Sequence, residues 1–396
     1  MNIHIISIAG TMTTPLALAL IKQGHTVTGS DQEKIYPPTS DLLKNININQ
    51  KLPKKIDLCI VGSSYNKFTK TKEEYDYIYN NHIPYISATN FIANNIGKKN
   101  SILIAGTVGK TSISSLLAWN LVKANLNPSY FFGGIAKDNF PSLVINNSDY
   151  SIIEADESIN GLDNKAKFLY YPIKYLILTS ASWEHKDSYN TSQKNFDAFR
   201  QLIEKIPKDG LLICNQLGEN IKKLTKYCAA PIIYYKNSNE NAVKTFCDFL
   251  KIDFDNNFSG IKRRLEIVKN ENNIIIIDDF AQSPERLKYV LDKLHREYPK
   301  HNIKVLFEPH ASFLQHSING LGKAFELASE IVVSAIKFNK NKSIRITASD
   351  YQKEIGSKFV YLPIKSDIIN HYHHNLKPFD LLVRFSSGQD NICHNI

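Results

Sequence analysis

Two glycines, a lysine and a threonine follow a short apolar run and could together bind a phosphate group. The run is Ile102–Ala105, and the polar residues come directly after it. Glycines let backbone N–H groups approach an anion closely, a lysine can reach the outer phosphates of a nucleotide, and a threonine hydroxyl can bind magnesium. The candidate loop consists of Gly106, Thr107, Val108, Gly109, Lys110, Thr111 and Ser112.

The residues after this loop predict an amphipathic helix. Ile113, Leu116, Leu117 and Leu121 recur at helical spacing. The N-terminus of such a helix carries partial positive charge, which favours a bound anion. The general nucleotide-binding signature has a further glycine where this chain has Ala105. A glycine-rich turn that caps an ordinary helix is therefore the alternative.

Three carboxylates are crowded together at the end of a predicted strand, 151–154. They belong to Glu154, Asp156 and Glu157. Carboxylates this close repel one another unless a cation is present, and Mg²⁺ prefers oxygen ligands. The segment therefore predicts a magnesium site near the phosphate loop, with a solvated loop as the alternative.

A histidine, His185, lies in a polar segment that follows the predicted strand 175–178. Glu184 and Asp187 are close to it in the sequence. In a parallel sheet this segment lies at the same edge as the phosphate loop, because both follow the carboxyl ends of strands. Ligand sites form outside these ends. We consider His185 a candidate ligand, and a structural histidine is the alternative.

The first part of the chain has the order strand, turn, helix, strand, which opens a dinucleotide-type fold. Gly10 lies in the turn after the predicted strand 3–8, and Asp31 ends the following strand. An acidic residue there can reach a ribose or a base. Gly10 is the one glycine of the usual fingerprint in this turn, so a plain strand–turn–helix is the alternative.

Two further pairs of charged residues lie in the last third of the chain. Arg263 and Arg264 could reach a phosphate, or form a basic pair on the surface. Asp278 and Asp279 end a predicted strand, where an acidic side chain can accept ribose hydroxyls.

Short apolar runs alternate with helical patterns along almost the whole chain. This alternation predicts an α/β protein with mainly parallel sheets, and 396 residues allow two or three domains. The polar segments 97–100 and 253–260 are the predicted boundaries. We therefore predict domains at 1–98, 99–260 and 261–396.

The composition restricts the class of protein. The net charge of +10 is spread without a dense basic stretch, which argues against nucleic-acid binding. The five cysteines are scattered, which indicates reduced thiols. No apolar run is long enough to cross a bilayer, and the N-terminus lacks the layout of a signal peptide. We expect a cytoplasmic protein without membrane association, acting as a monomer or weak dimer.

Together these segments resemble the Mur ligase family, the ATP-dependent amide-bond ligases of bacterial cell-wall synthesis. The resemblance covers nearly the whole chain and keeps the family's order. The family's own phosphate loop lacks the early glycine, which is consistent with Ala105. The segments that carry the resemblance are His4–Asp31, Ala105–Ser112, Glu154–Glu157, Glu184–His185, Gly260–Glu266, Asp278–Ala281 and Phe307–His310.

The resemblance implies three domains: Rossmann-like at the N-terminus, P-loop-type in the centre and Rossmann-like at the C-terminus. It implies ATP and Mg²⁺ as cofactors and UDP-N-acetylmuramate as the acid substrate. In this family the substrate carboxylate attacks the γ-phosphate of ATP to give an acyl phosphate, and an amine then displaces phosphate. The protein mainly positions the reactants and neutralises their charge.

The resemblance also implies a role for individual residues. Lys110 holds the β- and γ-phosphates, Thr111 and Glu157 hold one magnesium ion, and His185 holds a second. Arg264 approaches the γ-phosphate, and Asp279 the adenosine ribose. The implied catalytic residues are Lys110, Glu157, His185 and Arg264, and the implied substrate-binding residues are Gly10, Thr11, Ser30, Asp31 and His310.

Within the family, the likeness is greater to the recycling members that take a tripeptide, L-alanyl-γ-D-glutamyl-meso-diaminopimelate, than to those that add L-alanine. The stretches that carry this preference are Gly29–Asp31, Tyr36–Leu43, Ser115–Trp119, Phe132–Gly134 and Arg263–Glu266. Addition of L-alanine is the neighbouring alternative.

Several positions depart from the family pattern, and the segment between Cys214 and Gly260 is short. These departures leave open a second alternative, a paralogue that binds nucleotide without ligation. The altered positions are Ser7, Thr14, Pro15, Val108, Ser180, Glu184, Asn237, Ser238, Gln282, Ser283 and Ala311.

Overall fold

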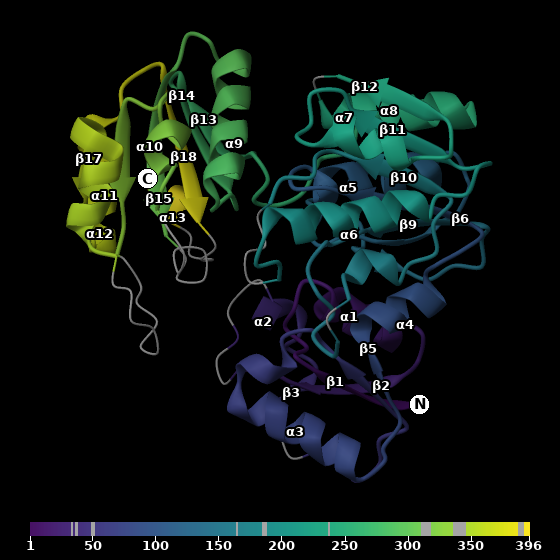
Figure 1. Ribbon diagram of the computed structural model, residues 1–396. Helices are drawn as coiled ribbons and strands as arrows, with labels where there is room; N and C mark the ends of the chain where they lie inside the picture. Colours follow the sequence, from purple (N-terminus) through teal and green to yellow (C-terminus); the bar gives the residue numbers. More distant parts are fainter. Residues whose placement is uncertain are drawn as a thin grey trace. The chain divides into compact units, whose positions relative to one another are not determined.

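The computed structural model describes residues 1–32, 35, 39–48, 52–163, 165–183, 188–236, 238–309, 318–335, 346–386 and 392–396. The chain divides into two compact units, 1–261 and 262–396 (Figure 1). None of the helices in these described ranges has both the length and the apolar character needed to cross a membrane.

The first unit begins with a five-stranded parallel sheet of order β3-β2-β1-β4-β5. Apolar residues alternate between its two faces: Ile3 and Ile5 pack on one side, and Ile6 packs on the other. The strands are β1 (Asn2–Ile6), β2 (Thr26–Ser30), β3 (Asn47–Ile48), β4 (Leu58–Val61) and β5 (Tyr85–Ser87). The helices are α1 (Thr13–Lys22), α2 (Thr39–Leu42), α3 (Thr69–Asn80) and α4 (Ala88–Asn95), with a 3₁₀ turn at Tyr65–Lys67.

The first strand is shorter than the predicted range 3–8. It ends at Ile6 because Ser7 has a φ of 60°, in the left-handed region that interrupts an extended strand. The chain turns there and enters α1.

The rest of the first unit is a seven-stranded sheet of order β12-β11-β10-β6-β9-β7-β8, parallel except for the β7–β8 pair. The strands are β6 (Asn100–Ala105), β7 (Ser129–Phe131), β8 (Leu143–Val144), β9 (Tyr150–Glu154), β10 (Tyr175–Leu178), β11 (Leu211–Asn215) and β12 (Ile232–Tyr235). The helices are α5 (Lys110–Lys123), α6 (Ser192–Glu204), α7 (Ile221–Leu224) and α8 (Asn239–Leu250), with 3₁₀ turns at Lys167–Leu169 and Thr225–Tyr227.

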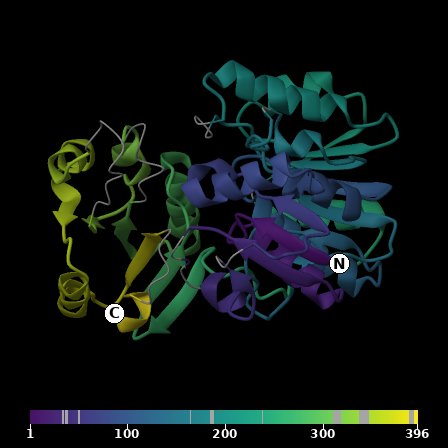
Figure 2. The same cartoon turned by 90° about the horizontal axis from the view of Figure 1, so that it is seen from below.

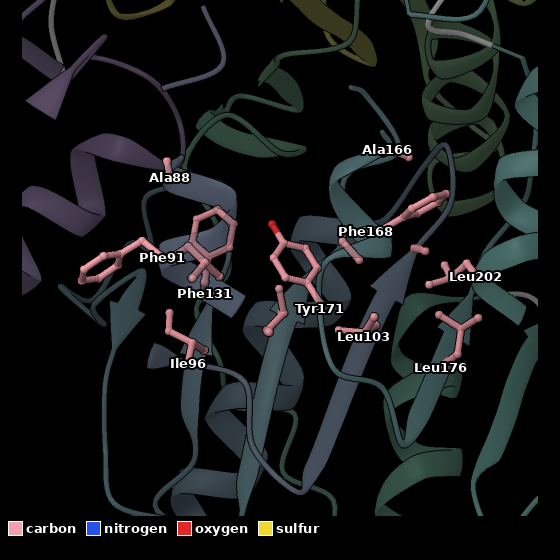
Figure 3. Packing of buried hydrophobic residues seen from close by; sticks show 14 of the residues in the cluster. Ala88, Phe91, Ile96, Leu103, Phe131, Ala166, Phe168, Tyr171, Leu176 and Leu202 are labelled. Carbon is pink, nitrogen blue, oxygen red and sulfur yellow. The ribbon is translucent and has the colours of Figure 1, made fainter. Parts of the chain in front are cut away.

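The two sheets of the first unit share one hydrophobic core. Phe91 and Ile96, from α4 and its C-terminal end, belong to the same buried cluster as Leu103 of β6 and Leu176 of β10. Figure 3 shows these side chains, with Tyr171 in the middle of the view. The opposite face of the larger sheet packs against α5 and α8 in a separate cluster. Because the core is continuous, 1–261 forms a single compact unit.

The second unit is a six-stranded sheet of order β13-β14-β18-β15-β16-β17, parallel except for the β13–β14 pair. Figures 1 and 2 show this sheet in green to yellow, and a separate buried cluster covers each of its faces. The strands are β13 (Glu266–Glu271), β14 (Ile274–Asp279), β15 (Asn302–Glu308), β16 (Glu330–Val333), β17 (Phe359–Tyr361) and β18 (Asp380–Ser386). The helices are α9 (Pro284–Glu297), α10 (Leu321–Ala324), α11 (Ala348–Ile355), α12 (Lys365–Asn375) and α13 (Ile392–Asn395), with a 3₁₀ turn at Gly356–Lys358.

The predicted α/β class with mainly parallel sheets is confirmed. In the larger sheet of the first unit, β10, β6 and β9 are neighbours and run parallel. Their carboxyl ends therefore lie side by side, and the polar segments that follow these three strands gather at one edge.

Candidate active site

The phosphate loop connects β6 to α5 and depends on two glycines. Gly106 has a φ of 120° and Gly109 a φ of 90°, which few residues with a side chain adopt. A Cβ atom at Gly106 would lie 2.3 Å from Thr179 Oγ1 and 2.7 Å from the carbonyl oxygen of Ser180. The backbone of the loop therefore lies directly against the segment that follows β10.

Two hydrogen bonds hold that segment over the loop. The backbone N–H of Thr107 donates to Ser180 Oγ over 3.2 Å, and the N–H of Ser182 donates to Thr107 Oγ1 over 3.0 Å. Thr179 Oγ1 is buried beside Gly106 and has no hydrogen-bond partner among the described residues. An unpaired buried hydroxyl and a glycine cradle fit a loop that binds a polar ligand.

Lys110 forms the central interaction of the site. Its Nζ donates to Glu157 Oε2 over 2.7 Å and to the carbonyl oxygen of Gly106 over 2.6 Å. Lys110 is 8% exposed and Glu157 1% exposed. The pair therefore joins the loop after β6 to the segment after β9 in a nearly dry environment, where an unpaired charge would be costly.

The hydroxyl of Thr111 pairs with the first carboxylate of the acidic segment. Thr111 Oγ1 donates to Glu154 Oε1 over 3.0 Å, and the other carboxylate oxygen accepts the N–H of Gly133 over 2.7 Å. The sequence predicted a magnesium site for the whole acidic segment, Glu154 included, but the family resemblance paired Thr111 with Glu157. The available signal was that Glu154 is itself the last residue of the strand.

The oxygen atoms of Thr111 and of the carboxylates around it fit a magnesium ion. A hydroxyl and carboxylate oxygens are the hard ligands that Mg²⁺ takes, and it usually completes its shell with phosphate oxygens and water. Within the described ranges, no group of three or more His, Cys, Asp or Glu side chains is placed to hold a metal ion. An ion at Thr111 would therefore depend on the bound nucleotide for other ligands.

The remaining carboxylate of the acidic segment is used within the fold. Asp156 Oδ2 accepts Lys167 Nζ over 2.8 Å and the hydroxyl of Ser158 over 2.5 Å. This arrangement neutralises Asp156 and fixes the turn after β9.

Asn239, which belongs to none of the predicted motifs, lies against the phosphate loop. A Cβ atom at Gly109 would lie 2.6 Å from Asn239 Oδ1. Asn239 begins α8, and Ser238 caps this helix by accepting the N–H of Asn241 over 3.2 Å. The shortened chain before Gly260 therefore still brings an amide side chain to the loop.

The turn after β1 is closed by its own side chains. Asp31 accepts the N–H of Ala9 and that of Gln32, each over 2.8 Å, and the N–H of Gly10 donates to Thr13 Oγ1 over 3.1 Å. Burial raises the pKa of Asp31, and the two N–H bonds oppose that rise. Two N–H groups of this turn are therefore already in use.

The other predicted substrate-binding residues of this turn differ in exposure. Ser30, at the end of β2, is buried, whereas Thr11 is exposed.

The two charged pairs of the last third come together in the second unit. Arg263 Nε donates to Asp278 Oδ2 over 3.0 Å, and Asp279 accepts the N–H of Leu265 over 2.8 Å. Burial raises the pKa of Asp279, and the positive charge of Arg264 opposes that rise. The candidate ligand His185, its sequence neighbours Glu184 and Asp187, and the substrate candidate His310 lie outside the described residues.

Three family models match the chain in consecutive order. Residues 2–99 match the Mur ligase family catalytic domain, residues 104–274 the Mur ligase middle domain, and residues 263–388 the Mur ligase glutamate ligase domain. The fold and the phosphate loop thus define an ATP-dependent amide ligase with three domains. The chain belongs to the Mur ligase family, as its sequence predicted.

Individual proteins resemble the chain over almost its full length. The UDP-N-acetylmuramate–L-alanine ligase of Clostridium botulinum (strain Hall) is 26% identical, over 98% of this chain and 95% of that protein. The murein peptide ligase from Psychrobacter arcticus has a TM-score of 0.69 at 24% identity, over 98% of this chain and 96% of that one. The UDP-N-acetylmuramate–alanine ligase from Thermotoga maritima has a TM-score of 0.73 at 20% identity, over 100% and 97%. The two structures support the fold assignment.

A substitution of Gly106 tests whether the loop binds ATP. In Gly106→Ala the new methyl group collides with Thr179 and Ser180, so we expect ATP affinity to fall at least tenfold in a fluorescence or calorimetric titration. Gly24→Ala is the matched control, because Gly24 also has a positive φ, 85°, but no atom within 4 Å of the added Cβ. Equal ATP affinity in the two variants would show that nucleotide binds elsewhere.

Proposed function

We propose that this chain is a murein peptide ligase, which joins UDP-N-acetylmuramate to L-alanyl-γ-D-glutamyl-meso-diaminopimelate with ATP. The observation that carries the ligase part of the proposal is the buried contact between Lys110 and Glu157 at the phosphate loop. This contact supports a site in which the Lys110 ammonium group and the Glu157 carboxylate are already placed to bind a nucleotide and its metal ion.

The tripeptide preference rests on the sequence segments around the site. Gly133 and Gly134 bring the chain after β7 to Glu154 and to Thr111: the N–H of Gly133 binds Glu154, and a Cβ at Gly134 would lie 2.9 Å from Thr111 Cγ2. The same glycine pair, after Phe132, is one of the stretches that resemble the peptide-adding members of the family.

The proposed chemistry assigns different tasks to the loop residues. Lys110 exchanges part of its contact with Glu157 for the β- and γ-phosphates of ATP, so its positive charge stabilises the transferring phosphoryl group. Thr111, with Glu157 or Glu154, holds Mg²⁺, which supplies charge neutralisation on the phosphates when bound. The muramate carboxylate attacks the γ-phosphate and ADP leaves; the amine then attacks the acyl carbon and phosphate leaves.

The remaining predicted roles stay part of the proposal. His185 holds a second magnesium ion, Arg264 approaches the γ-phosphate, and His310 contacts the amine substrate.

The turn around Gly10 and Thr11, together with Ser30 and Asp31, binds the UDP part of the muramate substrate. We also propose the domain boundaries 98/99 and 260/261, a cytoplasmic location beside the nucleotide-linked substrate, and a monomer or weak dimer.

A second candidate function is the addition of L-alanine to UDP-N-acetylmuramate. It is favoured by the Clostridium botulinum relative, an L-alanine ligase that matches 98% of this chain at 26% identity. The two functions share the acid substrate and the phosphate chemistry and differ in the amine.

Release of ADP and phosphate distinguishes the two candidates. With ATP, Mg²⁺ and UDP-N-acetylmuramate present, we expect kcat/KM for phosphate release to be at least tenfold higher with the tripeptide than with L-alanine. The amine determines this rate because phosphate leaves when the amine attacks the acyl carbon. The control omits the amine. The reverse preference would establish L-alanine addition, and no release with either amine despite ATP binding would contradict the ligase proposal for these substrates.

Removal of the Lys110 charge tests the catalytic part of the proposal. We expect Lys110→Ala to lower turnover by about a hundredfold, which corresponds to ~2.7 kcal/mol of transition-state stabilisation. Lys72→Ala is a suitable control, because Lys72 forms an exposed ion pair with Asp76 on α3, and its turnover should not change.

Loss of folding is a separate effect of the same substitution, because Lys110→Ala leaves Glu157 buried without its partner. The double variant Lys110→Met/Glu157→Gln removes both charges and should regain stability in thermal unfolding while staying inactive. Recovery of turnover in the double variant would contradict the role of Lys110.

A further inference from the structure

The strand β12 lies at one end of the seven-stranded sheet, next to β11 and without a described strand on its other side (Figure 1). The N–H of Leu212 on β11 donates to the carbonyl oxygen of Pro231 over 3.0 Å. Backbone groups that face one neighbouring strand alternate along the chain with groups that face away from it. The N–H and C=O groups of Ile232 and Tyr234 therefore point away from β11, toward the open edge of the sheet.

The strand β12 differs from the five other strands that end a sheet in the described part of the chain. β3 and β8 have two residues each, and β5 and β17 have three. β13 is longer, but three of its six residues are charged and its register shifts between Ile267 and Lys269. Short length, charge and bulges keep sheet edges from pairing with other chains. The four residues of β12, Ile232–Tyr235, contain neither a charge nor a bulge.

The same strand exposes apolar side chains to solvent. Ile233 is 36% exposed and Tyr234 is 51% exposed. Leu217, which is 77% exposed, lies in the turn after β11, beside the carboxyl end of β12, where the N–H of Gln216 donates to the carbonyl oxygen of Tyr235 over 3.0 Å. Removal of such apolar surface from water favours association with a second surface.

A second copy of β12 complements this edge. In an antiparallel pair, residues that form hydrogen bonds with each other alternate with opposed residues that do not. When Ile233 lies opposite the Ile233 of a second copy, Ile232 lies opposite Tyr234. The outward N–H and C=O groups of these residues then exchange hydrogen bonds on both sides of the two-fold axis that relates the copies.

The charges next to the strand favour this register. The chain has a net charge of +10, and Lys236 is the first charged residue after β12. With Ile233 on the axis, the two copies of Lys236 lie about 20 Å apart along the strands, at ~3.3 Å per residue. This separation exceeds the screening length of about 8 Å at physiological salt. An axis at Tyr234 would bring the two ammonium groups to about 13 Å.

We propose that two copies of this chain associate through antiparallel pairing of β12 with β12, with Ile233 on the two-fold axis. The seven-stranded sheets of the two copies then form one continuous sheet. Each copy contributes one short strand to the contact, so the association is weak. The inference does not depend on the ligase activity, because it concerns an edge of the sheet and is tested without substrates.

Sedimentation velocity of the full chain tests the association. We expect the weight-average mass to rise from that of a monomer toward that of a dimer between about 1 and about 200 µM, because small contacts dissociate in this range. Tyr234→Pro removes an outward N–H that the sheet does not use, so the fold should tolerate it. This variant should lower the association constant at least tenfold.

A matched pair of lysine variants provides the control. Tyr234→Lys places a charge at the edge and should also lower the association constant at least tenfold, and it serves if the proline variant does not fold. Tyr77 on α3 is likewise 51% exposed, and Tyr77→Lys should associate like the parent. A parent that stays monomeric at about 200 µM would overturn the inference and leave the edge to a strand of another protein. Unchanged association in Tyr234→Lys would overturn it as well.

Disulfide cross-linking tests the register. Opposed residues without mutual hydrogen bonds have Cα atoms about 4.5 Å apart, which a disulfide can bridge. A Cys228→Ser background removes the half-buried cysteine and leaves the buried ones. In this background and under oxidation by diamide, Ile233→Cys should form covalent dimers at least tenfold faster than Ile364→Cys, whose site is 57% exposed in the second unit. Equal rates at the two positions would contradict the pairing.

Discussion

The buried contact between Lys110 and Glu157 is the interaction on which the rest of the site depends. Both side chains are almost fully removed from water, and burial of two charges costs several kcal/mol unless they are paired and hydrogen-bonded. The short Nζ–Oε2 distance of 2.7 Å and the bond to the carbonyl of Gly106 meet that condition. The pair fixes the phosphate loop to the end of β9, so the loop and the acidic segment form one structure.

The sheets of the two units position the two groups of charged residues. In the first unit, parallel pairing of β10, β6 and β9 gathers three polar segments at one edge, and the continuous core beneath them restricts their movement. In the second unit, the ends of β14 and β18 hold Arg263 and the turn around Arg264. Each unit therefore places its functional groups at the carboxyl ends of parallel strands, where a ligand can reach them.

Much of the fold could be predicted because its signals are local. An apolar run, two glycines and Lys110 with Thr111 define a strand, a loop and a helix within a few residues, and the family resemblance placed them in order. The pairing of Thr111 with Glu154 could not be predicted from spacing, because Glu154 ends β9, Glu157 lies in the segment after the strand, and both carboxylates reach the phosphate loop. Asn239 reaches Gly109 through the packing of α8 on α5, which depends on tertiary structure. The bond of Asp279 to the N–H of Leu265 depends on the left-handed turn at Leu265, which the sequence does not indicate because this residue is not glycine.

Transfer of oxygen from the acid substrate to phosphate tests whether this protein activates a carboxylate with ATP. UDP-N-acetylmuramate labelled with ¹⁸O in its carboxylate is incubated with the protein, ATP, Mg²⁺ and the tripeptide, and the released phosphate is analysed by mass spectrometry or ³¹P NMR. We expect one ¹⁸O atom in each phosphate, because the carboxylate oxygen that attacks the γ-phosphate leaves with it when the amine forms the amide. Phosphate without ¹⁸O would contradict a ligase that activates the carboxylate at the Lys110 loop.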